Sequence, residues 1–386
     1  MIIILWWGLM IATYLVYPLV IRMLAKNKNL SQFQSFDQSE DLPTVGILIA
    51  AHNEEEVLEQ KLDSILSSQY DLTKVHIYLG LDDCSDRSLE IVESFKFKYP
   101  DSISFIESKR VGKPQMLNLL MESFQPQTDL CVFTDANVFF KSETLYELLK
   151  YFKTAEIGLV DSKYSLAEEL ISQQHENTYL SYEQKLKYEE GLAWGTMQGP
   201  FGGCFAIRTK LFQTIPENYL VDDFFIGMTV MKSGFLSILN PKALVIEEVH
   251  TTWEEEFSRK KRIATGNFQN LKHFSSIFKK PFTSLSVSWF FHKVLRWVLP
   301  LLFIGAVMLS FVEIFYLDGC FLPLLITLSL LIGVVTTYYI LQRLNLRLRT
   351  IERLSYFIYI NLALVQGFLL YQKGVKSNVW KPTQRK

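Results

Sequence analysis

The hydrophobic residues of this chain follow two patterns: long uncharged runs near both ends, and short runs that alternate with amphipathic stretches between them. The long runs cover residues 2–21, 298–317, 320–341 and 354–372. Glu313 is the only charged residue in these runs, and each run is long enough to cross a bilayer. Buried helices of a soluble core are the alternative, but three such runs within about 75 residues are typical of membrane helices.

The basic residues beside these runs predict their orientation. Arg22, Lys26 and Lys28 directly follow the first run, so we expect an uncleaved anchor whose amino end is outside and whose following domain is cytoplasmic. The basic tail 374–386 also favours the cytoplasm, whereas three crossings after the domain would place it outside. Either one late segment lies in the membrane interface, or the tail breaks the rule.

The short apolar runs predict an α/β domain. Buried strands are predicted at 44–50, 75–81, 102–106 and 130–134. Helices are predicted between them at 88–97 and 113–124, and after the first strand, where Asn53 is expected to cap a helix. This alternation predicts a doubly wound, mostly parallel sheet. Beyond Asp135 the alternation weakens; the predicted elements there are helices at 173–190, 223–232 and 254–270 and a glycine-rich loop leading into a strand at 199–208.

The pattern as a whole predicts six segments. They are an N-terminal transmembrane anchor at 1–24, a linker at 25–42, the α/β domain at 43–280, an interfacial amphipathic helix at 281–297, transmembrane helices at 298–373 and a basic tail at 374–386. The segment 281–297 mixes aromatic with basic residues, so it can also be the start of the next crossing.

Composition narrows the classes of function. The net charge of −1 gives no basic field of the kind that attracts nucleic acid. The four cysteines contain no CxxC pair and the six histidines form no ligand-spaced cluster, so neither a zinc site nor a disulfide framework is expected. Scattered free cysteines fit a reducing, cytosolic compartment for the soluble part.

Polar residues directly follow three of the predicted strands. They are, in chain order, His52 and Glu54, Asp82 and Asp86, and Asp135 and Asn137. The carboxyl ends of parallel strands meet at one edge of a sheet, where α/β proteins bind ligands. Acidic side chains there can bind ribose hydroxyls, a base edge, or an Mg²⁺ or Mn²⁺ ion that carries a diphosphate. The alternative is that each residue is an ordinary cap or turn residue.

Three further stretches carry charge on predicted helices. Arg110 and Lys113 lie at the start of the helix at 113–124, which indicates either an anion site or a basic turn. Asp222 and Asp223 lie at the start of the helix predicted at 223–232, where acidic side chains interact favourably with the helix dipole. Asp223 is also a candidate general base. The basic run 259–262 is either a solvated helix face or a source of positive charge for a departing diphosphate.

In order and spacing, these motifs resemble those of the inverting family 2 glycosyltransferases with the GT-A fold. The resemblance covers roughly residues 43–275, and its motifs are 45–55, 82–88, 110–118, 133–137, 199–208 and 221–223. The membrane segments are similar to those of the membrane-bound members, which include cellulose, hyaluronan, chitin and poly-N-acetylglucosamine synthases. The resemblance implies transfer of a sugar from a nucleotide sugar, expected to be a UDP-sugar, to a glycan or lipid-linked acceptor at the cytoplasmic face of the inner membrane.

The resemblance also implies a role for each matched residue. Asp223 would be the catalytic base, and Arg262 would offset charge on the leaving diphosphate. Asp135 and Asn137 would hold Mg²⁺ or Mn²⁺. The donor-binding residues would be Ala50, His52, Glu54, Asp82, Lys113 and Asp135. The acceptor side would be formed by Gly202, Gly203 and Asp222.

One motif departs from the family pattern. Processive members carry Gln-x-x-Arg-Trp, whereas the stretch 259–263 keeps Arg262 but lacks the Gln and the Trp, so the match does not extend to processivity. Two other functions remain open on the residues alone. A metal-dependent nucleotidyltransferase would release pyrophosphate. A membrane-bound nucleotide-sugar sensor, or an assembly subunit of a polysaccharide export system, would tolerate the loss of Asp223.

Overall fold

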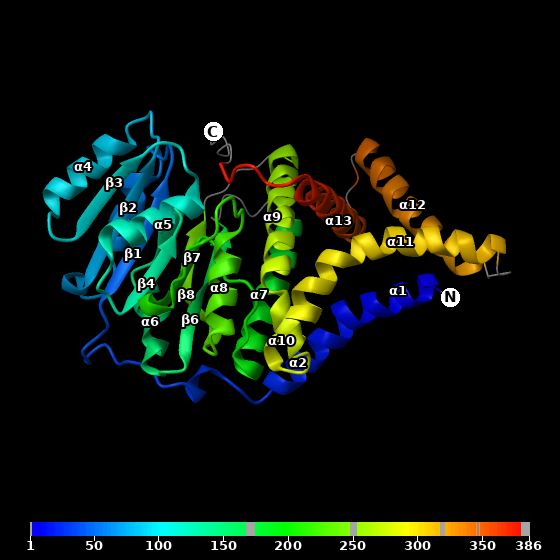
Figure 1. Ribbon diagram of the computed structural model, residues 1–386, viewed down its shortest axis with the longest axis horizontal. Helices are drawn as coiled ribbons and strands as arrows, with labels where there is room; N and C mark the ends of the chain where they lie inside the picture. The colour runs from blue at the N-terminus through cyan, green and yellow to red at the C-terminus, as the bar shows by residue number, and fades with distance from the viewer. Residues whose placement is uncertain are drawn as a thin grey trace. The chain divides into compact units, whose positions relative to one another are not determined.

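The computed structural model describes residues 2–166, 174–247, 253–316, 321–344, 346 and 348–379 (Figure 1). The chain divides into two compact units, each assembled from separate stretches of sequence. The sheet unit comprises Leu24–Ser172, Glu183–Thr251 and Val375–Lys386, and the helical unit comprises Met1–Met23, Gln173–Tyr182 and Thr252–Gly374. Sequence neighbours therefore do not always belong to the same unit.

The sheet unit is built on an eight-stranded mixed sheet with the order β3-β2-β1-β4-β7-β6-β8-β5. Its strands are β1 (Val45–Ala51), β2 (Val75–Asp82), β3 (Ile103–Ser108), β4 (Leu130–Thr134), β5 (Val138–Phe140), β6 (Ile157–Leu166), β7 (Cys204–Arg208) and β8 (Leu236–Glu247). Neighbouring strands are parallel except that β7 is antiparallel to β4 and β6, and β5 is antiparallel to β8. The predicted doubly wound, mostly parallel sheet is confirmed.

The register of the sheet brings three loops to one edge. β1 lies between β2 and β4 and is parallel to both, with Ala50 opposite Gly80 and Leu48 opposite Phe133. The loops after these three strands therefore begin at the same edge, because parallel strands end on the same side. This edge carries most of the polar residues singled out from the sequence.

Three strands, β5, β6 and β8, lie outside the alternation that the sequence predicts. β6 has Asp161 and Lys163 at its centre, and its register with β8 shifts between Ser162 and Lys163. β8 is continuous, but its apolar pattern is broken by the sequence Asn-Pro-Lys at 240–242. Polar residues inside a strand break the apolar run by which a buried strand is recognised. Asp161 is tolerated there because Lys187 pairs with it at 2.6 Å.

Helices cover both faces of this sheet. They are α3 (Leu58–Leu66), α4 (Ser88–Lys98), α5 (Lys113–Phe124), α6 (Thr144–Leu149) and α8 (Asp222–Lys232), together with the part of α7 (Gln174–Trp194) from Glu183 onward. α3, α4 and α6 share one apolar core with Ile47 and Ile49 of β1. α5 packs on the other face, where Met116 lies against Gly80. The two faces alternate along each strand because successive side chains point to opposite sides.

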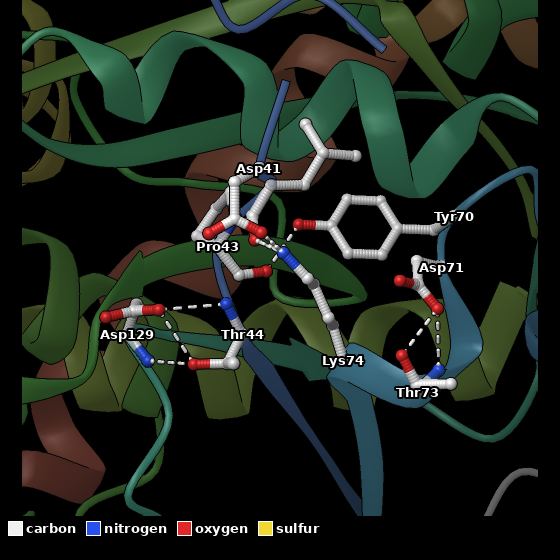
Figure 2. A network of polar contacts seen from close by, with 9 residues as sticks. Asp41, Pro43, Thr44, Tyr70, Asp71, Thr73, Lys74 and Asp129 are labelled. Carbon is white, nitrogen blue, oxygen red and sulfur yellow. Dashed lines mark hydrogen bonds and ion pairs between the residues drawn. The ribbon is translucent and has the colours of Figure 1, made fainter. Parts of the chain in front are cut away.

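A network of polar contacts holds the amino-terminal edge of the sheet (Figure 2). Asp129, just before β4, accepts hydrogen bonds from the backbone N and the Oγ1 of Thr44, just before β1, at 2.9 and 2.7 Å. The hydroxyl of Tyr70 donates to the carbonyl oxygen of Pro43 at 2.6 Å, and Lys74 pairs with Asp41. These contacts fix the entry of the linker into β1 and leave the opposite edge of the sheet for ligands.

The helical unit contains the predicted apolar helices. α1 (Ile2–Ile11) continues through a π-helical turn, Ala12–Val16, into α2 (Tyr17–Ala25). α10 (Ser284–Ser288) likewise continues through a π-helical turn, Trp289–Val294, into α11 (Leu295–Tyr316). α9 (Trp253–His273), α12 (Leu322–Arg343) and α13 (Arg349–Lys373) complete the described helices. Within the segment 281–297, residues 284–297 are thus the beginning of one continuous helix that ends at Tyr316.

Four helices in the described residues are long and apolar enough to span a membrane: Ile2–Ala25, Ser284–Phe315, Leu322–Arg343 and Arg349–Lys373. The indole nitrogen of Trp6 donates to the Leu299 carbonyl oxygen and that of Trp7 donates to Thr327 Oγ1, both at 3.0 Å. α1 therefore packs with α11 and α12 through hydrogen bonds as well as apolar contacts. The length and composition of these helices support membrane association.

Candidate active site

The loops that follow β1 and β2 are joined to each other by hydrogen bonds. His52 Nδ1 lies 2.6 Å from the carbonyl oxygen of Asp82, and the Glu54 backbone N donates to Ser88 Oγ at 2.9 Å. Asn53 Oδ1 accepts from the Ser85 backbone N at 2.8 Å. The prediction that Asn53 caps the next helix is wrong. Its backbone is left-handed, with φ of 54°, and α3 begins only at Leu58, so the side chain joins the two loops instead.

Asp82 organises the segment that leads into α5. Its Oδ1 accepts a hydrogen bond from the Val111 backbone N at 2.6 Å, and its Oδ2 accepts one from the Gly112 backbone N at 2.9 Å. The guanidinium of Arg110 pairs with the same carboxylate, which is 2% exposed. A buried carboxylate requires such partners. Both oxygens of Asp82 are therefore used to hold residues 110–112 at the end of β2.

Lys113, the first residue of α5, connects the other acidic positions. Its Nζ lies 2.6 Å from Asp135 Oδ1, 3.0 Å from the Gly202 carbonyl oxygen and 3.7 Å from Asp222 Oδ2. Burial opposes the charge on Lys113, but Asp135 and Asp222 raise its pKa above the usual value, so the ammonium stays charged. The backbone of residues 111–112 thus binds Asp82, and the next side chain, that of Lys113, binds Asp135 and Asp222.

Asp135 and Asn137 lie in the short turn between β4 and β5. Both are half-buried, whereas Ala136 between them is buried, so the two polar side chains share the more open face. In the described residues, no group of three or more His, Cys, Asp or Glu side chains is placed to hold a metal ion alone. The oxygens of Asp135 and Asn137 nevertheless fit Mg²⁺ or Mn²⁺, which commonly take a few protein ligands and complete their shell with phosphate and water.

Lys61 lies beneath this turn and has no exposed surface. Its Nζ donates to Thr134 Oγ1, at the end of β4, at 2.8 Å and to the carbonyl oxygen of Val138, at the start of β5. The two ends of the turn that carries Asp135 are therefore held by one amine. Burial lowers the pKa of Lys61 to about 7, and the Asp135 carboxylate only partly offsets that effect.

Asp222 and Asp223 begin α8 beside the glycine-rich loop. A Cβ on Gly202 would lie 2.6 Å from Asp223 Oδ2, so only glycine allows the carboxylate to approach this closely. Asp223 Oδ1 accepts a hydrogen bond from the Phe224 backbone N at 2.7 Å. Burial and the neighbouring Asp222 carboxylate raise the pKa of Asp223 to about 6. A carboxylate with a pKa near 6 is a stronger base than an ordinary aspartate and is still ionised at neutral pH.

The glycine-rich loop is fixed from below by buried charged groups. Asp161 Oδ1 accepts from the Phe201 backbone N at 2.7 Å, while its other oxygen pairs with Lys187 of α7 at 2.6 Å. Burial raises the pKa of Asp161, and Lys187 counteracts that effect. The backbone N of Gln198 donates to Glu190 of α7 at 3.2 Å. The carbonyl oxygen of Gly203 accepts from the Asp135 backbone N at 3.0 Å, so the loop also joins the β4–β5 turn.

The sheet unit brings together nearly all of the residues predicted from the sequence. Asp82, Asp135, Asp222 and Gly202 are connected through residues 110–113, and Asp223 touches Gly202. His52 and Glu54 hold the adjacent loop, and Ala50 is the second-last residue of β1. Gly203 joins the loop to Asp135. Arg262 belongs to α9 of the helical unit, so its role remains a prediction from sequence.

Sequence reasoning missed two buried lysines, Lys61 and Lys187. The signal for Lys61 was present, because it is three residues after Leu58 and four before Ile65 and so falls within the apolar stripe of α3. A charged residue inside such a stripe needs a buried partner, which here is the backbone and hydroxyl of the Asp135 turn. Lys187 carries no comparable signal, because its partner Asp161 is on a strand that the pattern does not reveal.

The pKa of Lys61 yields a prediction about stability. Its folded value of about 7 is below its ordinary value of 10.5, so between these pH values the unfolded chain binds a proton that the folded chain releases. Lys61 should therefore make the free energy of unfolding rise with pH across this window, by at most about 1.4 kcal/mol per pH unit. Below pH 7 both states are protonated and the dependence disappears.

The Lys61→Met variant removes the titrating amine but keeps most of the side-chain volume. The melting temperature, measured in detergent from pH 7 to 10, should rise less steeply with pH for this variant than for the parent chain. Lys141→Met, at an exposed lysine, is the matched control and should keep the parental slope. Equal slopes for Lys61→Met and the parent would show that the buried amine stays protonated throughout.

Comparison with known proteins extends these observations. The chain is 26% identical over 252 residues to "Probable glycosyltransferase YdaM" of Bacillus subtilis (strain 168), an alignment that covers 63% of this chain. The chain spans 60% of the length of that relative. Among solved structures, it resembles mannosyltransferase PcManGT from Pyrobaculum calidifontis, in complex with GDP-Man and Mn²⁺. That match has a TM-score of 0.69 at 17% identity and covers 96% of this chain and 99% of PcManGT.

The structural likeness to PcManGT confirms the predicted GT-A type of fold, with apolar helices at both ends. The sequence motifs resemble those of family 2, whereas the family model that matches this chain describes a different family with the same kind of fold. That model, glycosyl transferase family 21, matches residues 8–336, which is most of the chain. The chain belongs to glycosyl transferase family 21.

Proposed function

We propose that this protein is an inverting glycosyltransferase that moves a sugar from a nucleotide-sugar donor to an acceptor at the membrane. One observation carries the proposal: Lys113 lies among Asp135, Asp222 and the Gly202 carbonyl oxygen, directly beside Asp223. Two carboxylates pair with this one ammonium group, and the charge of Asp223 also acts on it, which leaves an excess of negative charge. Such a cluster at the carboxyl edge of a parallel sheet suits a cation and the phosphates that it brings.

The donor side is the edge formed by the loops after β1, β2 and β4. Asp82 contributes by holding residues 110–112 in place, so that the start of α5 faces the same edge as Asp135. The Lys113 ammonium group can bind a phosphate, and the amino end of α5 adds partial positive charge. His52 and Glu54 hold the loop after β1 against the loop after β2. We propose that the nucleoside is bound beside these two loops.

The chemical step is a single displacement at the anomeric carbon. Asp223 takes the proton of an acceptor hydroxyl, whose oxygen forms the new bond to the anomeric carbon. The bond from that carbon to the diphosphate oxygen breaks, and its electron pair leaves with the nucleoside diphosphate. Attack opposite the leaving group inverts the configuration. A divalent ion held by Asp135 and Asn137 would supply positive charge for the leaving diphosphate, and Arg262 is proposed to add to it.

The surroundings suggest where the acceptor is bound. Gly202, Gly203 and Asp222 lie next to Asp223, so the acceptor hydroxyl is proposed to reach Asp223 across the glycine-rich loop. The four membrane-length helices in the described residues favour a glycan or lipid-linked acceptor at the inner-membrane surface. We propose that the catalytic domain is cytoplasmic, where nucleotide sugars are available, and that the protein serves polysaccharide biosynthesis together with export or assembly partners.

A donor panel tests this proposal. Purified protein in lipid is incubated with UDP- and GDP-sugars plus Mn²⁺ or Mg²⁺, and free nucleoside diphosphate is measured. We expect release with one donor class, a UDP-sugar being the first to test, and a loss of release when EDTA removes the cation. Because PcManGT was solved with GDP-Man, GDP-mannose belongs in the panel. Release of pyrophosphate from a nucleoside triphosphate would instead indicate a nucleotidyltransferase.

The Asp223→Asn variant tests the catalytic base. The amide cannot accept the hydroxyl proton, so turnover should fall at least about 10²-fold, while the donor-induced rise in melting temperature stays close to that of the parent. Asp63→Asn, at an exposed position on α3, is the matched control and should keep full turnover. Retained turnover in Asp223→Asn would remove this residue from the mechanism.

The raised pKa of Asp223 predicts the pH dependence of the reaction. The base acts only when ionised, so kcat/KM should fall below about pH 6 instead of below pH 4. The Asp222→Asn variant removes a neighbouring negative charge and should move this fall to lower pH. A profile of kcat/KM that stays flat down to pH 4.5 would contradict the assignment.

A further inference from the structure

The segment 375–379 follows α13 directly and belongs to the sheet unit. A Cβ on Gly112 would lie 3.0 Å from Asn378 Oδ1 and 3.1 Å from the Asn378 carbonyl oxygen, so Asn378 rests on the loop that begins α5. The side-chain nitrogen of Asn378 is buried. A segment in contact with the sheet unit must lie on the same side of the membrane as that unit.

This contact limits how often the chain can cross the membrane. Within the part of the chain that the structure describes, three membrane-length helices lie between the sheet unit and segment 375–379: Ser284–Phe315, Leu322–Arg343 and Arg349–Lys373. A chain that returns to its original side crosses an even number of times. At least one of the three helices therefore does not cross.

The packing of α13 identifies that helix. The Phe257 and Tyr359 rings lie 4.9 Å apart, and Thr265 Oγ1 donates to the Gly367 carbonyl oxygen at 3.2 Å. Residue numbers rise together along the two helices, so α13 lies parallel to α9. The contact is close, because a Cβ on Gly367 would lie only 2.4 Å from the Cβ of Ala264. α13 therefore cannot enter the hydrocarbon region without α9.

α9 is too charged to enter the hydrocarbon region. Its first turn contains Glu254, Glu255 and Glu256, and residues 259–262 are all basic. Glu256 pairs with Arg259 at 2.9 Å and with Lys260 at 3.1 Å, but the helix remains strongly polar along its first half. Charged side chains at the centre of a bilayer are costly. A helix that packs lengthwise on α9 is held at the membrane surface with it.

α13 itself is suited to a surface position. Its mean hydropathy of 1.5 is the lowest among the four membrane-length helices in the described residues, whose other values are 1.9, 2.4 and 2.2. Leu354, Leu362 and Leu369 are 43%, 55% and 54% exposed and lie within about a quarter turn of one another. Arg349 precedes them and Lys373 follows them, in exposed positions. Such a helix has an apolar stripe for acyl chains and basic ends for lipid headgroups.

We propose that α13 lies along the membrane surface beside α9, on the side of the sheet unit, with its exposed leucines facing the lipid leaflet. α11 and α12 then cross the bilayer as a pair, and segment 375–379 returns to the Gly112 loop. This arrangement places the basic loop before α13 and the basic residues after it on one side. It removes the conflict that the charge pattern creates when all three helices cross. The proposal does not depend on the reaction catalysed.

Single-cysteine labelling of the full chain in membrane vesicles tests the proposal. In a Cys84→Ser, Cys320→Ser background, Phe97→Cys marks the sheet unit, at a position that is 91% exposed. Leu346→Cys marks the loop before α13 and Lys376→Cys the segment after it. An impermeant maleimide should modify all three from the same face. Phe321→Cys, at a 47% exposed position between α11 and α12, should react only from the opposite face and shows that the reagent distinguishes the faces.

Modification of Lys376→Cys from the face opposite to Leu346→Cys would overturn the proposal, because α13 would then cross. A depth measurement gives an independent reading. Nitroxide labels at positions 354, 362 and 369 should report the same shallow depth by oxygen and nickel-chelate accessibility. In a crossing helix the same labels would be spread over about 22 Å along the axis, and such a spread would also exclude a surface position.

Discussion

The active-site edge of this protein depends on the contacts made by residues 110–113. The backbone amides of Val111 and Gly112 and the guanidinium of Arg110 occupy the buried Asp82 carboxylate. The next side chain, Lys113, then extends to Asp135 and to the Gly202 carbonyl oxygen. Loops from three separate parts of the chain are thereby held around one short segment. Each contact is charge-assisted, and because the Asp82 carboxylate is buried, the loss of its partners would leave a buried charge uncompensated.

The sequence was sufficient to predict the first half of the sheet unit and the residues at its edge. Strands β1, β2 and β4 are largely apolar runs, and in a parallel sheet the polar residues after such runs lie at the same edge. Asp82 and Asp135 could therefore be placed together without coordinates for either. The apolar helices were equally clear, because an apolar, uncharged run of about 20 residues is typical of a membrane-spanning helix and rare in other structures.

The sequence was insufficient where buried polar groups are satisfied by distant partners. β6 was hidden because Asp161 interrupts it, and nothing local indicates that Lys187 will neutralise that acid. Lys61 was not singled out, although it lies in the apolar stripe of α3. The role of Asn53 was misjudged for a related reason: its side-chain oxygen had two possible partners, the start of a helix and the Ser85 amide, and the tertiary partner prevailed. Local propensity cannot decide such competitions.

The same segment that organises the catalytic edge also connects it to the membrane topology. Gly112 donates its backbone N–H to Asp82 on one side and supports Asn378 on the other. Segment 375–379 can reach that loop only if the preceding helix ends on the side of the sheet unit. A surface position for α13 satisfies this condition, since α9 already keeps its partner out of the hydrocarbon region. The charged character of α9 therefore constrains the path of the chain through the membrane as well as the chemistry proposed for Arg262.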